Sequence, residues 1–67
     1  MMTGDELRAH AVYLHGEWGW QTKLAADLQV DASSVRRWVS SAVPVPGPVE
    51  AAVRCFIAAE KKKRRGT

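Results

Sequence analysis

The chain has 67 residues and a net charge of +3, and 46% of its residues are hydrophobic. This length gives one domain with a thin stability margin, and the apolar fraction together with three tryptophans argues against intrinsic disorder. The single cysteine, Cys55, excludes an internal disulfide and a multi-cysteine zinc site.

The first predicted helix begins after Thr3 and ends near Gly16. Thr3 can cap this helix, and Glu6, three residues later, completes a capping box. The apolar stripe of the helix repeats at i, i+4 and i+7 and consists of Leu7, Ala11 and Leu14.

A glycine-broken connection over residues 16–20 follows and contains two indole rings. We expect Trp18 and Trp20 to fill the gap between the first helix and the elements that follow it. The alternative is that one of these rings stacks on a nucleobase, as in proteins that bind single strands.

Two short helices are predicted over residues 21–28 and 32–40, with only three residues between them. The two apolar stripes consist of Leu24, Ala25 and Leu28, and of Val35, Trp38 and Val39. So short a connection does not allow antiparallel packing, so the helices should cross at a steep angle with Val30 in the corner. Asp31 is expected to cap the second of these helices by accepting from its N-terminal amides.

The face of helix 32–40 that lies away from its apolar stripe is slim and cationic, and it carries Ser33, Arg36, Arg37 and Ser40. Such a face has the shape and charge needed to enter a DNA major groove. We expect Arg37 to reach base edges, and Arg36 to read a base or grip phosphate; the alternative is two solvated arginines. Residues 1–31 carry two basic and five acidic side chains, whereas residues 32–67 carry eight and two, which points to a polyanionic partner.

The pattern over residues 21–40 resembles the helix-turn-helix of lambda-repressor and Cro-like (XRE-type) DNA-binding domains. The matching positions are Gln21, Leu24, Ala25, Leu28, Val30, Ser34, Val35 and Trp38. The family usually has glycine in place of Gln29, because the residue that ends the first helix tends to take a positive φ; another residue there costs about 1 kcal/mol. The resemblance implies an all-α fold, a compact bundle of four or five short helices, with one domain over 1–60 and its motif at 21–40.

The DNA contacts expected from the residues and the resemblance together involve both helices and the loop after them. They are Gln21, Thr22, Lys23, Ser33, Ser34, Arg36, Arg37, Ser40 and Ser41. In the resembled family, a glutamine at the start of the first helix contacts the DNA backbone, and the loop after the second runs along it. The resemblance therefore assigns phosphate contacts to Gln21 and Ser41.

Three prolines and a glycine predict a stiff, extended loop over residues 41–48, whose Val43 and Val45 can fold back on the core. Pro48 then starts the last helix. The apolar stripe of that helix is Val49, Ala52, Val53, Phe56 and Ile57, of which the part toward Phe56 and Ile57 is available to a second subunit. Cys55 is expected to be buried or half-buried. Residues 61–67 form a basic C-terminal tail that solubilises the chain, attracts phosphate, or does both.

The chain lacks a convergent catalytic set, a phosphate-binding loop and a metal cluster, so we expect neither an enzyme nor a cofactor or metal. His10 and His15 are five residues apart and face different directions. We expect a sequence-specific regulator that binds double-stranded DNA as a homodimer and represses from an inverted-repeat operator. The alternative is a protein-interaction adaptor or inhibitor on the same scaffold, which would need an apolar outer face on helix 32–40.

No apolar run is long enough to span a membrane and no signal-peptide pattern opens the chain, so we expect a cytoplasmic, nucleoid-associated protein. The resemblance implies a bacterial or phage-infected cell as its setting. Small proteins of the resembled family include phage repressors, autoregulators encoded beside anti-CRISPR genes, and antitoxins.

Overall fold

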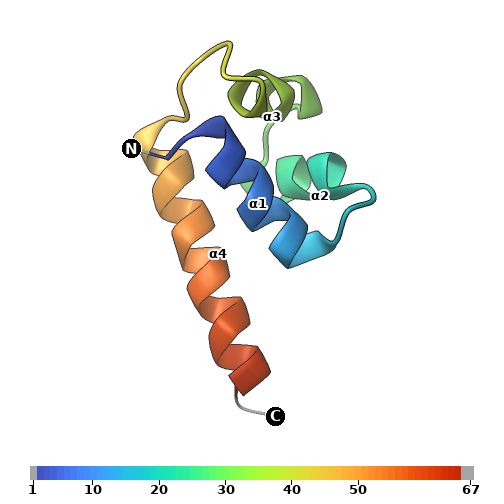
Figure 1. The fold of residues 1–67 in the computed structure, drawn as a ribbon, viewed down its shortest axis with the longest axis vertical. Helices are drawn as coiled ribbons and strands as arrows, with labels where there is room; N and C mark the ends of the chain where they lie inside the picture. Colours follow the sequence, from blue (N-terminus) through green and yellow to red (C-terminus); the bar gives the residue numbers. More distant parts are fainter. Residues whose placement is uncertain (1, 66–67) are drawn as a thin grey trace.

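The computed structural model describes residues 2–65, and within this range the chain forms four α-helices and no strand (Figure 1). The helices are α1 (Gly4–His15), α2 (Trp20–Leu28), α3 (Ala32–Val39) and α4 (Gly47–Arg65). Helix α1 packs against each of the other three, and α2 packs against α3. The predicted all-α class is confirmed, although α4, with 19 residues, is longer than the short helices expected.

Both ends of α1 form as the sequence predicts. The Thr3 hydroxyl accepts from the Glu6 backbone N–H at 3.1 Å, and the Glu6 carboxylate accepts from the Thr3 backbone N–H at 3.0 Å. The bond from the Thr3 N–H, and after it the interaction with the Thr3 side chain, stabilises the charged carboxylate and lowers the pKa of Glu6. At the other end, Gly16 takes a φ of 86°, which favours glycine, and the helix stops.

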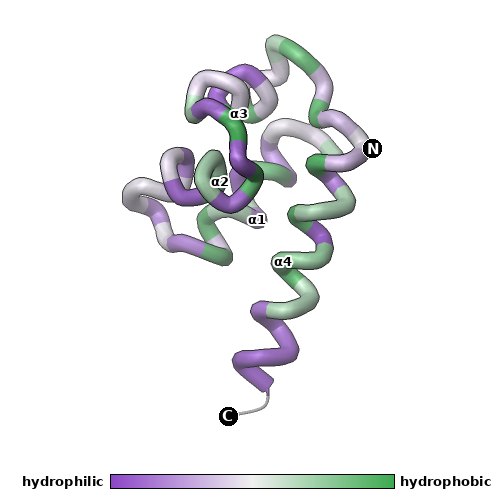
Figure 2. The backbone as a smooth tube through the Cα atoms, turned by 180° about the vertical axis from the view of Figure 1, so that it is seen from behind, coloured by the Kyte–Doolittle hydropathy of each residue, from purple (hydrophilic) through white to green (hydrophobic). Residues whose placement is uncertain are grey.

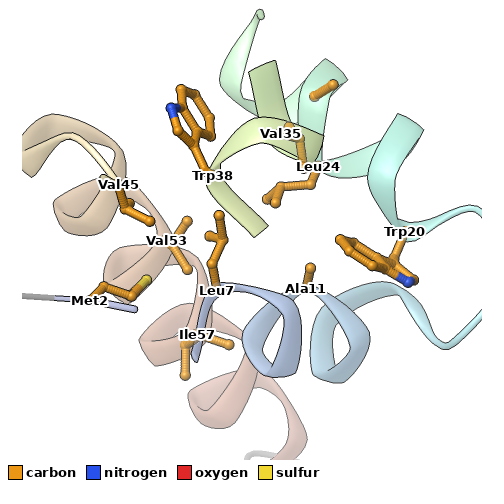
Figure 3. Close-up of a cluster of buried hydrophobic side chains, with 11 residues drawn as sticks. Met2, Leu7, Ala11, Trp20, Leu24, Val35, Trp38, Val45, Val53 and Ile57 are labelled. Atoms are coloured by element: carbon orange, nitrogen blue, oxygen red, sulfur yellow. The ribbon is translucent and has the colours of Figure 1, made fainter. Parts of the chain in front are cut away.

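The core lies where α1 meets the other three helices (Figure 3). Its buried members are Met2, Leu7, Ala11, Trp20, Leu24, Ala25, Val35, Trp38, Val45, Val53 and Ile57. Leu14, predicted on the α1 stripe, is only half-buried at the edge of this cluster. The residues predicted to face the core from α2 and α3 are either buried in this cluster or packed against it.

The start of α1 abuts the end of α3 at Gly4, which is buried. A Cβ placed on Gly4 would lie 2.5 Å from the carbonyl oxygens of both Trp38 and Val39. These are backbone atoms, which cannot swing aside as a side chain would. The close approach of the two helices therefore requires glycine at this position.

The two indole rings of the α1–α2 connection have opposite environments. Trp20 is 8% exposed and packs in the core, whereas Trp18 is 88% exposed. The expectation that both rings fill the gap is thus wrong for Trp18. Trp20 already belongs to α2 and points into the core, while Gly19, with a φ of 74°, turns the chain so that the preceding residues remain outside.

The N-terminal end of α4 is tied to the start of the chain. The Glu50 carboxylate accepts from the Met2 backbone N–H at 2.7 Å and from the Arg54 guanidinium at 3.0 Å. Hydrogen bonds from Met2 and then Arg54 lower the pKa of Glu50. In the preceding loop Val45 is buried, as predicted, whereas Val43 is 40% exposed.

Along α4, apolar residues give way to charged ones, as Figure 2 shows from behind. Val53 and Ile57 are buried, and Cys55 lies between them on the outward side and is exposed, so its predicted burial is wrong. The helix continues through the basic run, so residues 61–65 of the predicted tail are helical. None of the described helices combines the length and apolarity needed to cross a membrane.

Candidate nucleic-acid interface

Helix α3 has one buried face and one cationic face. Val35 is completely buried and Trp38 is 8% exposed, so both anchor the helix on the core. Arg36 and Arg37 are exposed. The buried face therefore fixes the direction in which the two arginines project.

The two guanidinium groups of α3 are not used inside the described part of the protein. Within residues 2–65, neither the Arg36 nor the Arg37 side chain has a hydrogen bond or an ion pair. Exposed guanidinium groups of this kind can offer their donors bidentately to phosphate or to a base edge.

The predicted hydroxyl contacts differ from one another in availability. Ser33 and Ser34, in the first turn of α3, are half-buried. Ser40 is exposed, but its hydroxyl donates to the Arg37 carbonyl oxygen at 3.1 Å, so its proton is already engaged. Ser41 is also exposed and takes a φ of 67°, which ends the helical path after α3.

Helix α2 ends in a tight turn that leads directly into α3. Gln29 has a φ of 58°, the positive value expected at this position. Its N–H donates to the Ala26 carbonyl at 3.2 Å, and the Val30 N–H donates to the Ala25 carbonyl at 2.9 Å. This pair of bonds is the Schellman arrangement, in which glycine is the usual residue at the left-handed position.

The N-termini of α2 and α3 both lack a side-chain cap. Asp31 occupies the N-cap position of α3, but its carboxylate accepts no capping bond, so the predicted side-chain role is wrong. Its extended backbone instead lets its carbonyl accept from the Ser34 N–H at 3.0 Å. The first amides of each helix are therefore left without a capping carboxylate or hydroxyl.

The predicted contacts on α2 lie in its first turn. Gln21 is half-buried, and Thr22 and Lys23 are exposed. Because α2 packs against α3, the structure places these residues and the serine and arginine residues of α3 on two adjoining helices.

Two polar contacts that join distant parts of the chain had no sequence signal. The His15 imidazole Nε2 lies 2.7 Å from the Asp27 carboxylate, which links the end of α1 to α2. Near the C-terminal end of α4, the Arg64 guanidinium donates to the Tyr13 carbonyl oxygen at 3.1 Å and lies 4.3 Å from the centroid of the Tyr13 ring. Each contact joins residues of two different helices, so the spacing within one segment does not indicate it.

Comparison of this chain with protein-family models, with curated proteins and with solved structures finds no match. A functional proposal therefore depends on the arrangement of the residues themselves. That arrangement is a small all-α domain in which a short helix, held by one apolar face, exposes two arginines on the other.

Proposed function

We propose that this protein is a sequence-specific double-stranded DNA-binding regulator that acts as a homodimeric repressor on an inverted-repeat operator. In this proposal α2 and α3 act as a helix-turn-helix, and α3 enters the major groove. The observation that carries the proposal is the exposure of Arg36 and Arg37, without a partner in residues 2–65, on a helix anchored by Val35 and Trp38.

The dimensions of α3 support this mode of binding. An α-helix with its side chains is about 10–12 Å in diameter, which matches the roughly 12 Å width of the major groove, and the outer face of α3 carries mostly small side chains beside the two arginines. Arg37 is assigned the base contact, because a guanidinium can donate bidentately to guanine O6 and N7. Arg36 is assigned a neighbouring base or phosphate, and the small hydroxyl residues beside the arginines allow close approach.

Phosphate contacts hold α3 in register on the duplex. The uncapped amides at the start of α2 can donate to a phosphate oxygen, with the helix dipole favouring the negative charge. Gln21, Thr22 and Lys23 add side-chain donors at the same end. Ser34 and Ser41 are assigned to flanking phosphates, and none of these contacts specifies a base by itself.

Dimerisation gives the operator its symmetry. Two recognition helices must lie about 34 Å apart to meet successive major grooves on one side of the DNA. The domain measures 38 × 25 × 20 Å, so the α3 helices of two copies placed side by side can be separated by a distance of this order. With the chain occupying the operator, repression follows from the exclusion of polymerase, as in the small phage and mobile-element regulators that residues 21–40 resemble.

The proposal is tested by titrating labelled duplexes, one taken from upstream of the chain's own gene and one random, over a series of salt concentrations. Affinity should fall steeply with salt. Arg37→Ala should weaken binding to the upstream site by about 1–3 kcal/mol and relax base preference there.

Arg54→Ala is the matched control, because it removes one positive charge from α4, where Arg54 pairs with Glu50. Equal losses on both duplexes with Arg37→Ala would contradict its assignment as a base reader. A folded wild-type protein that binds neither duplex would overturn the proposal and favour the protein-interaction adaptor.

A further inference from the structure

The last turns of α4 carry a second cationic surface, here called the basic end, which consists of Lys61, Lys62, Lys63 and Arg65. All four side chains are exposed, and within residues 2–65 none has a hydrogen bond or an ion pair. At about 100° per residue these positions surround the helix, so the charge is presented in several directions. A cluster of this kind is the electrostatic footprint of a polyanion-binding surface.

The neighbouring arginine holds this part of α4 in place. Arg64 pairs with Glu60 at 2.9 Å and reaches across to the Tyr13 carbonyl and ring near the end of α1. Carbonyl groups near a helix C-terminus lack partners within the helix, and Arg64 supplies one. Arg64 therefore has a structural role, which leaves the four residues of the basic end to meet a partner.

The basic end and α3 lie at opposite ends of the molecule. Figure 1, drawn with the longest axis vertical, has α3 near one extreme and the last turns of α4 at the other. That axis measures 38 Å, and the packed helices lie between the two cationic regions. Figure 2 gives the same separation from behind.

We propose that the basic end binds the phosphate backbone of a second DNA segment, so that a chain bound through α3 bridges two duplexes. This inference rests on the proposed function, because it takes the first duplex to lie on α3. Lysine ammonium groups suit the task, since they attract phosphate without reading sequence. Base readout and backbone attachment are thereby divided between two ends of one small domain.

The test is capture of one duplex by another at an ionic strength of about 0.15 M. One duplex is fixed to beads, the protein is added, and a fluorescent second duplex is offered. Wild-type protein should retain the second duplex. The triple variant K61Q/K62Q/K63Q should lose roughly tenfold or more of this capture, because counterion release at the basic end is removed, while its affinity for a single duplex changes little.

The charge-preserving variant K61R/K62R/K63R is the matched control and should capture the second duplex as wild type does. Both triple variants should remain helical, which circular dichroism checks. Capture by K61Q/K62Q/K63Q at the wild-type level, or no capture by wild type, would overturn the inference.

A different result would place the basic end on the same duplex as α3. In that case K61Q/K62Q/K63Q would weaken single-duplex binding and reduce its salt slope by about 3. That outcome also overturns bridging. Failure of the proposed function is distinguishable, because single-duplex binding would then be absent or insensitive to Arg37→Ala.

Discussion

The two cationic ends of this protein are supported in different ways. At α3, the helix that carries Arg36 and Arg37 has its other face buried in the core, and its last carbonyls lie against Gly4. Beside the basic end, Arg64 contacts Tyr13 of α1 on the surface of the protein. The position of α3 is therefore fixed more accurately than that of the basic end, which suits the proposed base readout at α3 and the proposed phosphate attraction at the basic end.

Trp38→Ala should have the largest effect, because it removes the main anchor beneath the arginines of α3. Loss of a buried tryptophan destabilises a protein by about 3–5 kcal/mol, which is comparable with the whole stability of so small a domain. We expect the variant to be largely unfolded by circular dichroism at room temperature.

Trp18→Ala is its matched control, since Trp18 is exposed and its loss should leave the melting temperature nearly unchanged. A folded Trp38→Ala protein that merely fails to bind DNA would mean that α3 faces the other way, with its tryptophan toward the DNA.

Gly4→Ala tests the backbone contact between α1 and α3. The new Cβ would lie 2.5 Å from two backbone carbonyl oxygens, so one helix must shift. Overpacking of this kind reduces the free energy of unfolding by about 1–3 kcal/mol, which urea denaturation can measure.

Gly47→Ala is the control, because a Cβ at this first residue of α4 meets nothing within 4 Å. A small loss is still expected there, since Pro48 restricts the backbone of the residue before it. Equal stability losses for the two variants would show that the contact at Gly4 is looser than described.

Arg64→Ala should have the smallest effect on overall stability and a local effect on the basic end. The change removes the hydrogen bond to Tyr13 and the pairing with Glu60, both on the surface. Amide exchange over residues 61–65 should become faster, while the melting temperature changes little.

Arg65→Ala is the matched control, because it removes the same charge one position along α4. Amide exchange over residues 61–65 should be faster in Arg64→Ala than in Arg65→Ala. Equal exchange rates in the two variants would mean that helical propensity alone, and not the contact of Arg64 with Tyr13, keeps this segment helical.

Much of this architecture was predictable because it depends on neighbours in the chain. The left-handed turn at Gln29 was expected only from the resemblance of residues 21–40, whereas the capping box of Thr3 and Glu6 and the end of α1 at Gly16 are local features. The same holds for α3, where helical periodicity alone separates Val35 and Trp38 from the two arginines. The candidate DNA-binding face is thus visible in the sequence.

Whether Cys55 and each of the two indole rings are buried could not be predicted from neighbouring residues in the chain. Apolar character favoured burial for Trp18, Trp20 and Cys55 alike, but only Trp20 is buried. The core contains one of the two indoles, that of Trp20 at the start of α2, and the chain turns at Gly19 so that Trp18 lies outside. Composition cannot supply that information, because the size of a gap depends on where the surrounding helices lie.

The sequence by itself determined both ends of α1 and which side of α3 is apolar, because caps, turns and periodicity act over a few residues. Only the tertiary structure decided that Gly4 lies against the end of α3, that His15 pairs with Asp27 across 12 positions, and that Arg64 meets Tyr13 across 51. These contacts arise from the packing of the helices around α1, and no spacing along the chain encodes them.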